Sequence, residues 1–424
     1  MRRIILPVVT ILALMQPCVL KADIWNLTGG LGYSQLNDNT ENEKKDLLVL
    51  NLSPSYQSAT WEFSLDLNLR WDIDDGSFFS EEWERRGAWL RPLEKLGYRT
   101  LDESLSVSLL QYWQMTLGSG QTLRGLIGGA ELEYSLPGLY LERKNRTTTL
   151  QIFVDQAIDP NVGGFSFVWE PRPEILFSLE AAIDPTAPAQ WSGGFKQGRP
   201  QADSEETVYG YAGEGRARFY DTALLNFSLF MNAGILNDTQ GVGLGFQADM
   251  DFSQAYLNQV SLEASSVFCN NGYVPAYFDE LYQIERWGVQ GETLLQLNPL
   301  DGSGLDRIMV MSKLGYRLGE FFRLEGRYDQ FDDKSMKRAG LLLRLLEEGG
   351  KGIEALVWSR SDEEDEELFQ KDLNMFTRVS ALFNLFPHLL LKLNYDYSWA
   401  FLEKAGGAVP ASDLVLQAQY TISF

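Results

Sequence analysis

Residues 413–424 read DLVLQAQYTISF, an almost unbroken alternation that ends on an aromatic side chain. A β-strand turns successive side chains to opposite faces, so this stretch has one apolar face and one polar face. The apolar face holds Leu414, Leu416, Ala418, Tyr420, Ile422 and Phe424, and the other holds Val415, Gln417, Gln419, Thr421 and Ser423. The pattern predicts a strand with an apolar medium on one side and a polar one on the other.

Residues 60–72 show the same alternation with larger side chains. Trp61, Phe63, Leu65, Leu67, Leu69 and Trp71 share one face, and charged or polar residues occupy the other. The two tryptophans stand about 10 residues apart, the length that a tilted strand needs to cross a bilayer between its interfacial aromatic girdles. A soluble sandwich also alternates, but the paired terminal aromatics favour a membrane strand.

Strands of this kind recur along the whole chain. Counted back from Phe424, the connections between them alternate between long and short, as they do in outer-membrane barrels. The count reaches about 20, including strands over residues 103–117 and 123–135 joined by a turn at 118–120. The sequence therefore predicts an all-β fold: a single transmembrane antiparallel up-and-down β-barrel of about 16–20 strands.

The N-terminus has the features of a secretory signal peptide. Arg2 and Arg3 precede the apolar run 4–14, and Ala22 is a suitable cleavage residue. The alternative is a buried N-terminal helix. We expect residues 1–22 to be the signal peptide and residues 23–424 to be the barrel, with no further domain. Cys18 leaves with the signal, and Cys269 then stands alone, so neither a disulfide nor a metal site is expected.

The C-terminal strand and its terminal Phe424 resemble the closing strand of Gram-negative outer-membrane β-barrels. Residues 391–424 are loosely similar to the ends of phosphate-selective and general porins. The resemblance implies a place in the outer membrane, contact with its lipid and lipopolysaccharide, and recognition of Phe424 by the barrel assembly machinery. It is compatible with a monomer or a homotrimer.

Two classes of function are disfavoured, although an enzyme that uses carboxylates alone stays an alternative. The formal net charge of −22 argues against nucleic acid as a partner, because phosphate binding needs a basic surface. The single histidine, His388, lies in an expected tight turn with no serine placed to pair with it. We therefore expect no enzyme activity, no catalytic residue and no cofactor.

The polar faces of the expected strands carry charges of both signs. Charges in a dry core are costly, so their number predicts a wet lumen or one filled by polar loops. One interpretation is that the arginines pair with carboxylates and brace the wall. The other is that some line a constriction and set selectivity, for which the candidates are Arg317, Arg323, Arg327, Arg216, Arg218 and Glu214.

Two long connections, 73–100 and 271–306, could narrow the lumen. Both mix aromatic and charged residues, and both are longer than most loops. They either fold inward as constriction loops or form lids at the cell surface. The constriction candidates are Phe79, Trp83, Arg85, Arg86, Asp279 and Glu280.

The function that these features favour is a porin-like channel for passive passage of small hydrophilic solutes. The alternative is a barrel that conducts nothing, such as a surface adhesin, a scaffold or an assembly component, whose lumen is filled by the two long connections.

Overall fold

The computed structural model describes most of the chain. The predicted signal peptide and Phe424 lie outside the described residues, which are 24–38, 43–79, 88–111, 113–128, 136–158, 160–190, 195–196, 199–200, 204–252, 258–270, 273–277, 289–290, 293–294, 306–333, 336–346, 351–361, 368–369, 375–386, 388–402 and 407–423.

In these residues the wall is a closed antiparallel barrel of 20 strands, in which β3 and β4 are two halves of one broken strand. Its first half comprises β1 (Ile24–Asp38), β2 (Glu43–Gln57), β3 (Trp61–Leu65), β4 (Leu67–Asp72), β5 (Leu93–Arg99), β6 (Leu105–Leu110), β9 (Gly138–Lys144), β10 (Thr148–Val154), β11 (Gly163–Arg172), β12 (Ile175–Gln190) and β15 (Ser204–Asp221). The second comprises β16 (Leu225–Leu236), β17 (Thr239–Asp251), β18 (Asn258–Asn270), β21 (Arg307–Leu318), β22 (Phe322–Phe331), β23 (Lys337–Leu346), β24 (Gly352–Ser361), β25 (Met375–Phe386), β26 (Leu389–Leu402) and β27 (Gly407–Ser423).

A few short elements lie outside the wall sheet. They are the 3-10 turn η2 (Ala88–Leu90) and the strand pairs β7 (Trp113–Thr116) with β8 (Arg124–Gly128), β13 (Phe195–Lys196) with β14 (Arg199–Pro200), and β19 (Val289–Gln290) with β20 (Thr293–Leu294). No helix of the described chain has the length and apolar character that a membrane-spanning helix needs.

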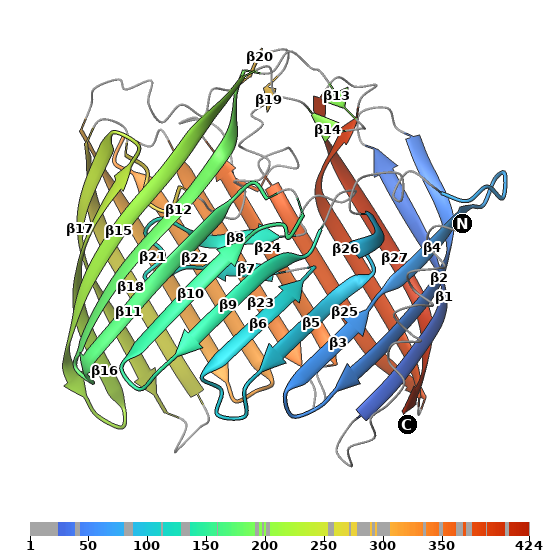
Figure 1. Ribbon diagram of the computed structural model, residues 1–424, viewed down its shortest axis with the longest axis horizontal. Coiled ribbons are helices and arrows are strands. Elements are labelled where there is room, and N and C mark those ends of the chain that lie inside the picture. The colour runs from blue at the N-terminus through green and yellow to red at the C-terminus, as the bar shows by residue number, and fades with distance from the viewer. Residues whose placement is uncertain are drawn as a thin grey trace.

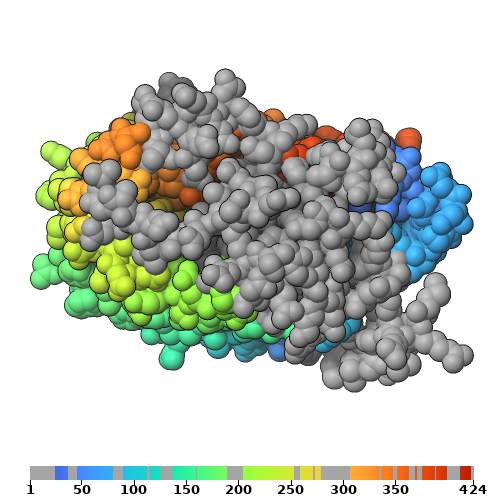
Figure 2. All heavy atoms as spheres, turned by 90° about the horizontal axis from the view of Figure 1, so that it is seen from above, coloured from blue at the N-terminus to red at the C-terminus, as the bar shows by residue number. Residues whose placement is uncertain are grey.

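The first and last strands close the ring. β1 pairs antiparallel with β27 in an unbroken register from Asn26 opposite Ser423 to Asp38 opposite Ala411. Every other wall strand pairs with its neighbours in the chain, which is the up-and-down topology. Viewed from above, the colours run around the outline until red meets blue (Figure 2). The predicted fold class is confirmed.

The connections differ in length at the two ends of the barrel. The C-terminus of β27 lies at the end of the barrel that carries the short turns (Figure 1). The amide of Thr421 donates to the carbonyl oxygen of His388 at 3.0 Å, which places His388 at the short-turn end, as expected from the sequence. Residues 362–367, six consecutive acidic side chains that the alternation of connections assigns to the opposite end, lie outside the described residues.

The outer face of the barrel is apolar and its inner face is polar, the inverse of a soluble protein. On neighbouring strands β16 and β17, Met231 and Leu244 are 60% and 65% exposed, whereas Asn232, next to Met231, is buried. β27 repeats the pattern: Leu416 and Tyr420 are exposed, and Gln417 and Gln419 are buried. A wall of this kind exposes its apolar side chains to lipid and its polar ones to the lumen.

Two expectations about individual strands are wrong. Residues 113–128 form a separate hairpin, β7–β8, rather than the two wall strands predicted at 103–117 and 123–135; the wall keeps only β6 from that region. In exchange, β5 lies within the predicted long connection 73–100 and pairs with β3 and β6. The prediction thus counted a wall strand at 123–135 that the barrel lacks, and it missed β5. These two errors offset each other, so the total of 20 strands still agrees.

Leu244 offers a test of the lipid-facing surface. Leu244→Arg should destabilise the folded barrel by about 2–4 kcal/mol relative to Leu244→Ala, because it places a charge near mid-bilayer. The measurement is a denaturant titration of folding into phospholipid vesicles. Equal stability of the two variants would contradict a lipid-facing Leu244.

Candidate functional site

The β7–β8 hairpin lies inside the barrel, between β6 and β9 in sequence but unpaired with either (Figure 1). Leu117, Leu123 and Leu126 of the hairpin are fully buried. They belong to one apolar cluster with inward side chains of the wall and with part of the connection after β18; its other large members are Phe153, Val267, Met309, Met311, Phe331, Tyr273 and Tyr277. This cluster fills part of the lumen with protein.

A polar cavity of about 260 Å³ lies between the hairpin and the wall strands β21 to β24. The hairpin contributes Thr116 and Arg124. The wall contributes Lys313, Arg323, Glu325, Gly326, Arg327, Gly340, Leu342, Leu356 and Trp358. Its charged lining therefore consists of four cations and one carboxylate. We call this space the charged passage.

Arg327 and Asp329 form the most buried ion pair at the passage. The Arg327 guanidinium donates to Asp329 Oδ2 from Nε at 2.8 Å and from Nη2 at 2.5 Å, and Asp329 is fully buried. Arg338 of β23 is the second cation on the same oxygen, at 3.3 Å. One carboxylate thus holds two guanidinium groups.

The Arg327 guanidinium also lies 5.6 Å from the ring centroid of Trp358. The Trp358 ring rests against Gly340, where any side chain would collide with it. A glycine at this position is therefore required for the indole to lie flat on the inner wall beside the passage. The contact adds a cation–π interaction to the ion pair that holds Arg327.

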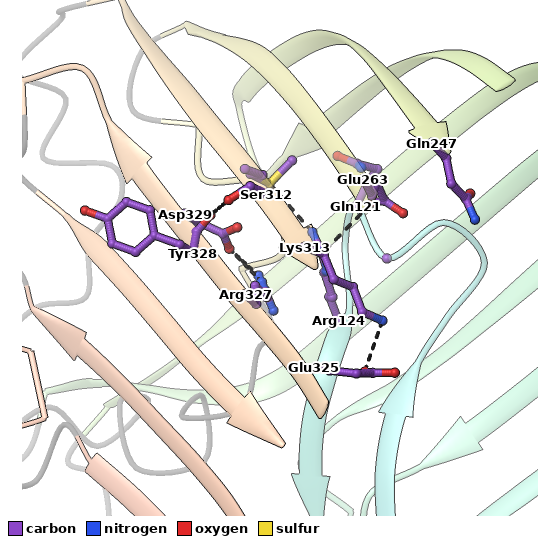
Figure 3. Close-up of polar contacts among 12 residues, drawn as sticks. Gln121, Arg124, Gln247, Glu263, Ser312, Lys313, Glu325, Arg327, Tyr328 and Asp329 are labelled. Carbon is purple, nitrogen blue, oxygen red and sulfur yellow. Dashed lines mark hydrogen bonds and ion pairs between the residues drawn. The ribbon is translucent and has the colours of Figure 1, made fainter. Parts of the chain in front are cut away.

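A second charged group stands nearer the short-turn end of the same strands. Glu325 accepts from Arg323 at 2.5 Å and from Lys313 at 3.3 Å. Arg124 of the hairpin lines the same cavity and lies 3.8 Å from Glu263 of β18. Figure 3 shows Arg124, Lys313 and Glu325 converging from the hairpin and the wall.

A further cavity of about 380 Å³ continues toward the short turns. It shares Arg323 and Glu325 with the charged passage and reaches Arg317. There the Nε of Arg317 donates to the carbonyl oxygen of Gly319 at 2.8 Å. The predicted candidates Arg317, Arg323 and Arg327 thus lie in sequence along two adjoining cavities, and their role in selectivity stays a prediction.

Other inward charges pair across neighbouring or nearby strands. Arg378 lies 2.5 Å from Asp396, Arg344 lies 2.5 Å from Glu354, and Arg70 lies 2.8 Å from Asp413, which also accepts from Ser34. Because β4 and β27 are separated by β1 and β2, the Arg70–Asp413 contact spans the closing seam. These pairs brace the wall, as one of the two interpretations expected.

The remaining selectivity candidates lie on β15. Glu214 is buried and accepts from Arg216 at 2.9 Å, and the Arg216 guanidinium lies 4.9 Å from the Phe230 ring. Arg218 lies close to the short turn and contacts Asp221 at 3.2 Å. None of the three lines the charged passage.

Of the constriction candidates, only Phe79 belongs to the described residues. It is buried, its amide donates to the carbonyl oxygen of Arg70 at the end of β4, and Lys45 Nζ lies 5.1 Å from its ring centroid. Trp83, Arg85, Arg86, Asp279 and Glu280 lie outside the described residues.

The sequence reasoning did not select Arg124 or Trp358 as site residues. Arg124 was assigned to a wall strand, and a tryptophan in an alternating strand is expected at the lipid interface. Trp358 lies two and four residues after Leu356 and Glu354, so it is on the same face of the strand as a charged, inward-facing residue. This spacing could have placed it in the lumen. In the described part of the chain, no group of histidine, cysteine and carboxylate side chains could hold a metal ion.

No family model and no curated protein matches the chain. Solved structures similar to this chain include the outer membrane protein OpdK of Pseudomonas aeruginosa, at 11% identity and a TM-score of 0.34 over 96% of this chain and 100% of that one. OccK8 (OprE) of the same organism has 9% identity and a TM-score of 0.35 over 95% and 98%. OccAB4 of Acinetobacter baumannii has 9% identity and a TM-score of 0.34 over 96% and 100%.

TM-scores in this range do not align individual residues, so the assignment rests on the barrel itself. A closed ring leaves no unpaired strand edge, and its apolar exterior matches a bilayer. The chain is a closed β-barrel of the membrane-spanning type. Charged side chains of its wall point inward.

Asp329 offers a test of the buried charge cluster. Asp329→Asn should lower the free energy of unfolding by about 3–5 kcal/mol, because it leaves two buried guanidinium groups without their carboxylate. Glu354→Gln, which breaks a half-exposed pair, should cost about 1 kcal/mol or less. Urea titrations of the folded barrels measure both, and equal losses would contradict a buried cluster.

Proposed function

We propose that the barrel is a channel for the passive passage of small hydrophilic solutes and that it favours anions. The observation that carries the proposal is the charged passage, whose lining has four cations against one carboxylate. Rings and ladders of cationic side chains favour anions in a pore. The passage also adjoins a second polar cavity that leads toward the short-turn end.

The contrast with the whole chain supports a local role for these cations. The protein has an excess of 22 acidic charges, yet the passage is lined mainly by Arg124, Lys313, Arg323 and Arg327. Lys313 is the most direct probe among them, because its side chain is 40% exposed and shares Glu325 with Arg323. Its ammonium group is thus available to a passing solute.

The barrel that conducts nothing is the second candidate. The buried apolar cluster around Leu117, Leu123 and Leu126 supports it, because such packing inside a lumen excludes water. In that case the hairpin would be a permanent filling, and the protein would act as an adhesin, a scaffold or an assembly component. The two proposed functions differ in one measurable property: only a channel gives discrete openings in a lipid bilayer.

Planar-bilayer recording of the purified, refolded protein tests the proposal. We expect discrete openings and a reversal potential in a KCl gradient that indicates preference for chloride. A unit charge about 4 Å from an ion contributes about 1 kcal/mol in water. Because that charge attracts chloride and repels potassium by the same amount, Lys313→Gln should lower the chloride-to-potassium permeability ratio by roughly 30-fold at most.

Arg218→Gln is the matched control, because it removes one inward cation outside the passage and close to the short turn. It should change the permeability ratio less than Lys313→Gln does. Absence of openings in the wild type would overturn the channel and favour the second candidate. Equal effects of the two variants would overturn the assignment of selectivity to the charged passage.

A further inference from the structure

A single wall carboxylate holds the tip of the hairpin. Glu180 of β12 is 3% exposed and accepts from the amides of Gly120 at 3.1 Å, Gln121 at 2.5 Å and Thr122 at 2.9 Å. The hydroxyl of Ser119 adds a longer contact of 3.4 Å. Three consecutive backbone N–H groups thus converge on one carboxylate.

The backbone of the tip is built for this contact. Gly118 and Gly120 have φ values of +50° and +75°, in the left-handed region that glycine adopts without strain. A Cβ at Gly118 would lie only 2.9 Å from Glu180 Oε2. The turn therefore forms a concave nest of N–H groups of the kind that binds anions, and the anion is a side chain of the wall.

Within the described part of the chain, the hydrogen-bond partners of Glu180 all belong to the hairpin tip. The neighbouring carboxylate Glu214 of β15 is paired with Arg216 instead. Three backbone hydrogen bonds to one buried side chain thus attach the hairpin tip to β12.

The opposite side of the tip is held through the connection after β18. The amide of Ala276 donates to the carbonyl oxygen of Gln121 at 2.7 Å. Arg338 of β23 donates in turn to the carbonyl oxygens of Ala276 and Pro275, each at 3.0 Å. The tip is therefore attached directly to β12 and, through residues 275–276, to β23.

We propose that Glu180 is a positioning residue that sets the width and selectivity of the passage. It touches no residue of the charged passage. By holding residues 120–122, it fixes the two arms of the hairpin, which place Thr116 and Arg124 in the passage lining. Release of the tip would let the arms move away from β21 and β22 and would widen the lumen. The proposal rests on the proposed channel function.

Hydrogen exchange and bilayer recording on the same samples test it. In Glu180→Gln, an amide replaces one acceptor oxygen with a donor that faces the N–H groups of the tip. The amides of Gly120, Gln121 and Thr122 should exchange at least about tenfold faster than in the wild type, while those of the wall strands stay unchanged. Single-channel conductance should rise, and chloride preference should fall because Arg124 leaves the passage.

Two further variants make the result specific. Glu354→Gln also removes one inward carboxylate but contacts only the wall, so it should change neither the exchange of the tip nor the conductance. Glu180→Asp keeps the charge on a shorter side chain and should fall between the wild type and Glu180→Gln. It also provides the measurement if Glu180→Gln does not fold.

The outcomes separate this proposal from the channel function. Faster exchange at the tip without conductance in any variant would overturn the channel and, with it, a role in passage width. The wild type could conduct while both Glu180 variants keep its conductance and its rate of hydrogen exchange at the tip. That result would overturn only the role of Glu180. Faster tip exchange with unchanged conductance and selectivity would show a structural contact and would also overturn the positioning role.

Discussion

The backbone hydrogen bonds between β1 and β27 are the interaction on which the rest of the structure depends. In a bilayer an unpaired strand edge has no water to bond, so a sheet is stable there only when it closes. Their register brings Leu416 and Tyr420 to the lipid face, and Gln417 and Gln419 to the lumen, along one seam. A shift by one residue would reverse both faces.

Closure also creates a wide interior lined with polar groups, which must be filled by water or by protein. In this chain, protein fills one part of the interior and cavities occupy another. The hairpin fills part of the lumen with an apolar cluster around Leu117, and the remaining space beside β21 to β24 is lined by charges. The buried Asp329 is held by two cations of opposite sign, Arg327 and Arg338. Toward the cavity, Lys313 is 40% exposed. Some of these side chains thus both pair with one another and line the cavities.

Period-two alternation predicted the barrel because lipid and lumen impose opposite demands on successive residues. It missed β5 because Glu94 and Lys95 are consecutive charges that break the pattern. The structure accommodates them with a bulge: Ser64 pairs with Lys95 and Leu65 with Leu93, leaving Glu94 as the extra residue. The period of two cannot tell a wall hairpin from one inside the lumen, so 113–128 was misplaced.

The site was predictable only in part. Arg323 and Arg327 were predicted because they lie on the polar, inward-facing side of a strand that alternates without interruption. Their partners Glu325 and Asp329 follow two residues later on the same face. Arg124, Arg338 and the Glu180 contact could not be found in this way, because they join segments that no local pattern brings together. Hydrogen bonds such as that from the Thr122 amide to Glu180 depend on where the hairpin lies.

The most direct test of the account is therefore the position of the hairpin inside the ring. A Cβ placed at Gly210 of β15 would lie 3.7 Å from the Cβ of Thr122, within the range for a disulfide. In a variant with Cys269→Ala, the pair Thr122→Cys and Gly210→Cys should cross-link on mild oxidation of the folded barrel, as seen by mass spectrometry. Two free thiols that both react with an alkylating reagent after oxidation would contradict a hairpin tip held against this wall.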